Sequence, residues 1–107
     1  MTNSSNSLEI IFADAGLADL DHLLAGLPPN ARVHLLDPTK DGLQQMVAAL
    51  GDEQNISAVH ILTHGSQGTL QLGNLRLDSG NLASHSQSLA TIGQALAPDA
   101  DLLLYVS

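Results

Sequence analysis

Short apolar runs of strand length alternate with segments whose leucines recur every three or four residues, and this alternation is what most constrains the fold. The runs occupy residues 8–13, 32–36, 58–63 and 102–106. Apolar runs of this length are typical of buried strands, whereas recurrence at three or four residues is typical of amphipathic helices. Strands that alternate with helices form right-handed crossovers, so the order predicts a mainly parallel sheet with helices on both faces.

The segments between these runs predict three helices and a hairpin. Helices are expected over 17–27, from a cap at Thr39 or Asp41 to Gly51, and over 79–97. The first and the last of them end at prolines, which cannot continue a helix. Residues 69–77 alternate apolar and polar side chains about Gly73-Asn74, which predicts a β-hairpin. The expected fold class is therefore α/β, a three-layer sandwich with a mainly parallel four-stranded sheet plus a small β-hairpin.

One domain accounts for nearly the whole chain. Its 107 residues are 44% apolar, which is ample for one core and too little for two. Residues 1–7 are polar and are expected to be a flexible lead-in, so the single α/β domain is expected to span 8–107. These first residues carry no positive charge and no signal-peptide pattern follows them, so the chain as given is expected to stay in the cytoplasm.

The charge balance excludes two classes of partner. The chain has 3 basic and 11 acidic residues and a net charge of −8. Such a surface repels both a phosphate backbone and the anionic face of a membrane, so we expect no nucleic acid as a partner. No continuous segment of the sequence approaches the roughly 20 apolar residues of a membrane span, so no membrane insertion is expected either.

The chain contains no cysteine. A disulfide framework, a thiolate metal site and a thiol nucleophile are therefore all excluded within these residues.

Polar residues follow several of the predicted strands. In open α/β sheets, ligands bind beyond the carboxyl ends of the strands, where Asp14, Asp37, His64 and Ser107 are expected to lie. Turn and helix-cap roles are favoured for the two aspartates. The third predicted strand ends at Thr63 and enters a loop at His64-Gly65, and His64 at the start of this loop is a candidate general base. A structural hydrogen bond from this imidazole to a loop carbonyl is the alternative.

Other site templates are weak or missing. His60 lies four residues before His64 on the same strand face, but no carboxylate or cysteine at ligand spacing accompanies this pair. We therefore expect no metal and no cofactor. The sequence also lacks a GxGxxG after the first strand and a GxxxxGK[ST] loop, which argues against dinucleotide and nucleoside triphosphate sites. The remaining histidines are interpreted as structural: His22, His34 and His85.

Several stretches resemble a bacterial domain of unknown function. They are residues 8–14, 24–28, 35–37, 41–42, 60–66, 70–73 and 101–105. That domain typically stands at the N-terminus of very large surface proteins rich in cadherin-like, Ig-like or calcium-binding repeats. The resemblance covers nearly the whole chain from Leu8 onward.

This family in turn resembles the caspase-like peptidases of clan CD, gingipains and separase-like enzymes among them. In those enzymes a His-Gly after one strand pairs with a cysteine after the next core strand, and His64-Gly65 matches the first half. Family members usually continue the last strand as Leu-Leu-Leu-Tyr-Gly-Cys, whereas here Tyr105 is followed by Val106 and Ser107. The resemblance thus implies a caspase/gingipain-like half, truncated relative to the family, with Ser107 at the position of the cysteine.

The expected function is that of a non-catalytic, caspase-like N-terminal module of a large bacterial surface or adhesin-type protein, with a role in interaction or assembly. The alternative is a fragment of a His/Cys peptidase domain that processes its parent chain and is inactive here because the cysteine is missing. A serine hydrolase that joins Ser107 or Ser66 to His64 and Asp37 is disfavoured, because no GxSxG elbow is present.

The resemblance also bears on partners and location. A protein partner or the parent chain is expected, together with a homodimer formed by edge-strand pairing if the last strand lies at an open edge. Within a larger protein that carries a C-terminal export signal, the domain would lie at the cell surface or outside the cell.

Overall fold

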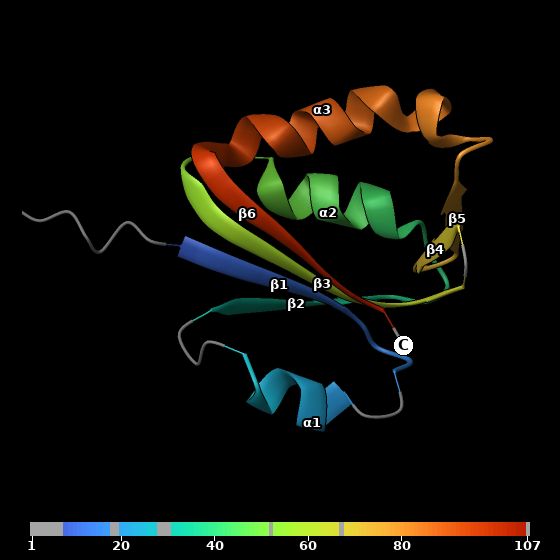
Figure 1. Ribbon diagram of the computed structural model, residues 1–107, viewed down its shortest axis with the longest axis horizontal. Coiled ribbons are helices and arrows are strands. Elements are labelled where there is room, and N and C mark those ends of the chain that lie inside the picture. Colours follow the sequence, from blue (N-terminus) through green and yellow to red (C-terminus); the bar gives the residue numbers. More distant parts are fainter. Residues whose placement is uncertain (1–7, 18–19, 28–30, 52, 67, 107) are drawn as a thin grey trace, which may run out of the picture.

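The computed structural model describes residues 8–17, 20–27, 31–51, 53–66 and 68–106 (Figure 1). The predicted lead-in over 1–7 and the candidate residue Ser107 lie outside the described residues. The strands are β1 (Leu8–Asp14), β2 (Arg32–Leu36), β3 (Ile56–Ser66), β4 (Thr69–Leu72), β5 (Leu75–Asp78) and β6 (Leu96–Val106). The helices are α1 (Leu20–Ala25), α2 (Gly42–Leu50) and α3 (Ser86–Ala95), and a 3₁₀ helix at Leu82–His85 precedes α3. The predicted α/β class is confirmed.

The strands form one open six-stranded sheet. β1 pairs in parallel with β2 and with β3, and β3 pairs in parallel with β6. The carboxyl end of β3 continues past this region and pairs with β4 in the antiparallel direction, and β4 pairs in turn with β5. The predicted hairpin is therefore an extension of the sheet and not a separate unit.

Alternation along the strands divides the core between the two faces of the sheet. Ile10 and Phe12 of β1 pack with the buried side chains of α2 and α3, among them Met46 and Ile92. The neighbouring strand residues face the other way and pack against α1: Ile11, Ala13 and Leu62. Figure 1 shows α2 and α3 on one side of the strands and α1 on the other. Because successive strand side chains point to opposite faces, the apolar runs of β1 and β3 supply both sets. The run at 102–106 was expected to form a buried strand, but its residues 102–105 are exposed.

Helix α2 follows its sequence pattern closely. The side chain of Asp41 accepts a hydrogen bond from the backbone N–H of Gln44 at 3.1 Å, which caps the first turn. Leu43, Met46 and Leu50 are buried on one face. Of the two caps that the sequence predicted, Thr39 and Asp41, the structure has Asp41.

The β4–β5 hairpin turns at Gly73-Asn74, as predicted, and the turn fixes the hairpin to the start of α2. Gly73 has a φ of +62°, a conformation that side chains with a Cβ rarely adopt. A Cβ at this position would also collide with the carbonyl oxygen of Lys40. The backbone N–H of Asn74 donates to that same carbonyl at 2.8 Å. Its side-chain amide donates to the carbonyl oxygen of Thr39 at 2.9 Å.

Several predicted boundaries were wrong. Strand β3 runs to Ser66 and not to Thr63, because pairing with β4 extends it. The helix predicted over 79–97 begins later, as a 3₁₀ helix at Leu82, since the Asp78 carboxylate accepts from the N–H groups of Gly80 and Asn81 and forms a turn there. The same segment leaves the helix at Leu96, where β6 begins, so Pro98 lies in a strand and does not end the helix.

Candidate functional site

His64 lies in β3, and its placement in a loop by the sequence analysis was wrong. It is paired with Gln71 of β4, and Gly65 is paired with Leu70. The preceding residue, Thr63, is buried, and its hydroxyl donates to the carbonyl oxygen of Gln71. The backbone of His64 is therefore fixed between two strands, while its side chain is exposed.

A groove of about 260 Å³ lies beside His64. His64, Gly65, Thr69, Gln71 and Arg76 line it. The strand register explains this grouping, because His64 pairs with Gln71 and Gln71 pairs with Arg76, which places the three side chains in one row on one face. Directly paired residues of antiparallel strands have Cβ atoms about 5 Å apart, so the row spans about 10 Å.

The opposite face of the hairpin is apolar. Leu70 and Leu77, which alternate with the polar row, pack against the core and line a larger groove of about 550 Å³ together with Leu82. The two faces of one hairpin thus have different chemistry, as period-two alternation requires.

The end of β6 lies beside His64. Thr63, the residue before it, pairs with Val106, and Leu62 pairs with Tyr105. The register therefore brings together the carboxyl ends of β3 and β6, as the sequence analysis expected. Ser107 and the side chain of Ser66 lie outside the described residues, so the structure places neither hydroxyl relative to the imidazole.

Asp14 and Asp37 have turn roles. The Asp14 carboxylate accepts from the N–H of Gly16 at 2.8 Å and is buried. The Asp37 carboxylate accepts from the hydroxyl of Thr39 at 2.7 Å and from its backbone N–H at 2.8 Å. These two hydrogen bonds from Thr39 hold the pKa of the Asp37 carboxyl below its ordinary value. The turn interpretation of both aspartates is confirmed.

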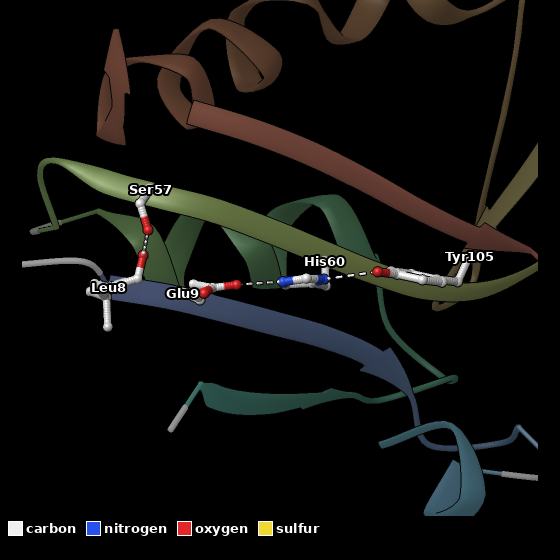
Figure 2. Close-up of polar contacts among 5 residues, drawn as sticks. All are labelled: Leu8, Glu9, Ser57, His60 and Tyr105. Atoms are coloured by element: carbon white, nitrogen blue, oxygen red, sulfur yellow. Dashed lines mark hydrogen bonds and ion pairs between the residues drawn. The ribbon is translucent and has the colours of Figure 1, made fainter. Parts of the chain in front are cut away.

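His60 joins three strands of the sheet and was not recognised for this role from the sequence. Its Nε2 lies 2.8 Å from Oε1 of Glu9 on β1, and its Nδ1 lies 3.1 Å from the hydroxyl oxygen of Tyr105 on β6. Figure 2 shows the three side chains in line, with His60 between Glu9 and Tyr105. His60 is buried, and the ring of Tyr105 stacks near it at a centroid distance of 5.9 Å. Both ring nitrogens therefore have partners other than a metal ion.

A sequence signal for this cluster existed. Glu9 and His60 each interrupt an apolar run that is otherwise buried, and buried polar side chains need hydrogen-bond partners. The identity of those partners depends on long-range strand register, which the runs alone do not give. Among the described residues, no group of three or more His, Asp or Glu side chains is arranged to hold a metal ion.

The other histidines lie away from the groove. His22 is in the last turn of α1, and His85 is at the end of the 3₁₀ helix. The ring of His34 on β2 lies 5.5 Å from that of Phe12. Its Nε2 is buried, and within the described ranges no hydrogen-bond partner contacts it.

Nearly the whole chain matches a known family of protein domains. Residues 10–107 match a family described as "Domain of unknown function (DUF4347)". No curated protein matches the sequence. Among the helices of the described segments, none has the length and apolar character needed to cross a membrane.

Proposed function

We propose that this chain, which belongs to the DUF4347 family of domains of unknown function, is a non-catalytic interaction module that self-associates through the open edge of β6. The single observation that carries the proposal is this edge. Within the described segments, β6 pairs with β3 and no strand pairs with its other side. An unpaired strand edge presents a row of N–H and C=O groups that favours the addition of another strand.

The side chains of β6 favour pairing at its carboxyl-terminal half. Four consecutive residues there are exposed apolar or aromatic side chains: Leu102, Leu103, Leu104 and Tyr105. Leu102 is 61% exposed and Leu104 is 48% exposed. The amino-terminal half contains Pro98, Asp99 and Asp101, which are residue types that prevent edge pairing. The part of the edge that lacks such protection is therefore the last part of the strand.

A second copy of the chain is the partner that this strand fits best. Two β6 strands that pair in the antiparallel direction about Leu103 place Leu102 opposite Leu104 and Asp101 opposite Tyr105. Leucine side chains then cover one another, and no aspartate lies opposite an aspartate. Parallel pairing in register would instead put each aspartate opposite its own copy, which destabilises the pair. The two-fold antiparallel arrangement is also the closed symmetry typical of dimers.

The oligomeric state and two matched variants test this proposal. Light scattering after size exclusion is expected to give a dimer for the wild-type chain and a monomer for Leu104→Lys, because the new charges lie against the apolar partner edge. Leu35→Lys is the control, since Leu35 is 55% exposed on β2, at the other edge of the sheet. A wild-type monomer at high concentration, or dimer loss only with Leu35→Lys, would refute pairing through β6.

The absence of cysteine supports the non-catalytic part of the proposal. A hydroxyl is a poorer nucleophile than a thiolate unless a base and an oxyanion hole are both in place. The chain offers His64 as a base but no thiol.

A second candidate is that the family domain is a His/Cys peptidase that processes its parent chain and is disabled here. The observation that favours it is the exposed His64 beside the end of β6. The test is the double variant Val106→Gly/Ser107→Cys, which restores the Tyr-Gly-Cys pattern of the family, incubated with the parent chain. Cleavage that disappears when His64→Ala is added would support a peptidase origin, and no cleavage in either case would count against it.

The resemblance to the caspase-like peptidases and to the N-terminal domain of large surface proteins supports the rest of the proposal. The proposed fold is a three-layer sandwich with a mainly parallel sheet and a caspase/gingipain-like half. The module stands at the N-terminus of a large surface or adhesin-type protein, at the cell surface when the parent is exported and in the cytoplasm as the isolated chain.

A further inference from the structure

We propose that the groove beside His64 binds a carboxylate group presented by a protein partner, with Arg76 as the residue that holds the charge. The register puts His64, Gln71 and Arg76 in one row, and Thr69 lines the same groove. This inference does not depend on the pairing of β6, because the groove and the edge of β6 use different residues.

The charges of the chain make this groove unusual. The protein has only 3 basic residues against 11 acidic ones. Arg32, the first residue of β2, forms an ion pair with Glu53 at 2.7 Å. Arg76 is exposed in the groove, and the described residues include no carboxylate within ion-pair distance of its guanidinium. An exposed arginine in a concave site gives that site of an otherwise acidic protein a local preference for an anion.

The groove provides donors suited to a carboxylate. The guanidinium of arginine presents parallel N–H groups that match the two oxygens of a carboxylate. The Thr69 hydroxyl adds a further donor at the rim. Gln71 donates from Nε2 to the carbonyl oxygen of Gly73 at 2.9 Å, which holds its side chain toward the hairpin turn and leaves the arginine as the main anion contact.

Size and charge distinguish a carboxylate from a phosphate. The volume of about 260 Å³ suits one small side chain and is below the range of about 300–1,000 Å³ for whole small-molecule ligands. Asp78, two residues along β5, does not line this groove, and its carboxylate accepts from the backbone N–H groups of Gly80 and Asn81. The guanidinium of Arg76 therefore offers a single positive charge, which matches a singly charged carboxylate better than a doubly charged phosphate.

The test is an NMR titration of the isotope-labelled 107-residue chain with small probes. N-acetyl-aspartate amide presents a side-chain carboxylate, N-acetyl-alanine presents a C-terminal carboxylate, and N-acetyl-asparagine amide is the uncharged control. We expect at least one carboxylate probe to shift the amide signals of Gly65, Gln71 and Arg76 with an affinity in the millimolar range, and the comparison of the two identifies the source. The asparagine probe is expected to leave these signals unchanged.

Two charge-removing variants show whether Arg76 is responsible. Arg76→Gln is expected to weaken carboxylate binding about tenfold or more, because it removes the charge-assisted hydrogen bonds between the guanidinium and the carboxylate. The Arg76 side chain is exposed, so the variant is expected to keep the wild-type pattern of signals elsewhere. Arg32→Gln is the matched control and is expected to bind as the wild type does.

Three results would overturn the inference. They are the absence of any shift with both carboxylates, equal binding by Arg76→Gln and the wild type, and tighter binding of inorganic phosphate than of either carboxylate. Dimer loss in Leu104→Lys with unchanged carboxylate binding would separate this site from the β6 edge.

Discussion

His60 Nε2 lies 2.8 Å from Glu9 Oε1, and this contact joins two residues that are 51 positions apart in the sequence. The other ring nitrogen of His60 faces the hydroxyl of Tyr105, 45 positions further along the chain. With its proton on Nε2, the imidazole donates to Glu9 and accepts from Tyr105, so each polar atom has a partner. The cluster therefore ties β1, β3 and β6 together in the half of the sheet that leads to the proposed pairing edge.

Replacement of His60 tests this role. We expect His60→Ala to lower the free energy of unfolding by about 2–4 kcal/mol, because it removes a buried side chain and leaves two polar partners unpaired. Tyr105→Phe is expected to cost about 1–2 kcal/mol, since Nδ1 loses its only side-chain donor. Urea denaturation measures both losses.

Glu9→Gln is the matched control for the cluster. The amide oxygen of glutamine still accepts from Nε2, and the carboxylate it replaces is partly exposed, so the cost is expected to stay within about 1 kcal/mol. A loss as large as that of His60→Ala would mean that the charge of Glu9, and not the hydrogen bond, stabilises the cluster.

The pKa of Asp37 is predicted to depend on Thr39. Thr39→Ala removes the hydroxyl that contributes most to lowering this pKa, so we expect the pKa to rise toward its ordinary value of 3.8. A group whose pKa is lower in the folded state stabilises the fold above its unfolded pKa and loses that contribution as the pH falls through its folded pKa. The stability difference between wild type and variant is therefore expected to be larger at neutral pH than in acid.

NMR titration of the carboxyl carbon of Asp37 measures this change directly. Thr39→Ser keeps both the hydroxyl and the backbone N–H and is expected to leave the pKa low. An Asp37 pKa that does not change in Thr39→Ala would show that the backbone N–H alone accounts for the effect.

The position of the hairpin is predicted to depend on Gly73. Gly73→Ala forces a Cβ into an unfavourable φ of +62° and against the carbonyl oxygen of Lys40. We expect a loss of about 2–4 kcal/mol in unfolding free energy, together with changed NMR signals at His64 and Arg76. Thermal and urea unfolding provide the stability values.

Gly68→Ala is the control that has the backbone strain without the collision. Gly68 also has a positive φ, of +79°, but a Cβ there meets no atom within 4 Å. Its expected cost is about 1 kcal/mol, from strain alone. Equal costs at the two glycines would mean that the collision with Lys40 adds nothing to the strain of the positive φ.

The elements that the sequence predicted well are those with local causes. The cap of α2 at Asp41 and the turn at Gly73-Asn74 depend on residues that are neighbours in the chain, and both are confirmed. The strands at 8–13 and 32–36 were also placed to within one residue, because uninterrupted apolar runs mark them.

The parts that the sequence did not predict depend on distant pairing. His64 was expected in a loop, but β4 pairs with it and extends β3 to Ser66. The grouping of His64 with Arg76 follows from two successive strand registers, which no local pattern reveals. His60 was considered as a weak metal ligand, although its partners are a glutamate and a tyrosine from strands at opposite ends of the chain.

Hydrogen exchange followed as a function of protein concentration tests the pairing of β6 most directly. If two copies pair through this strand, its outward backbone N–H groups exchange freely in the monomer and become protected as the dimer forms. The account predicts that protection of the outward N–H groups among residues 102–105 rises with concentration, while the amides of β2 at the other edge do not change. Amides at 102–105 that exchange at the same rate at every concentration, in a sample that light scattering shows to be dimeric, would contradict it.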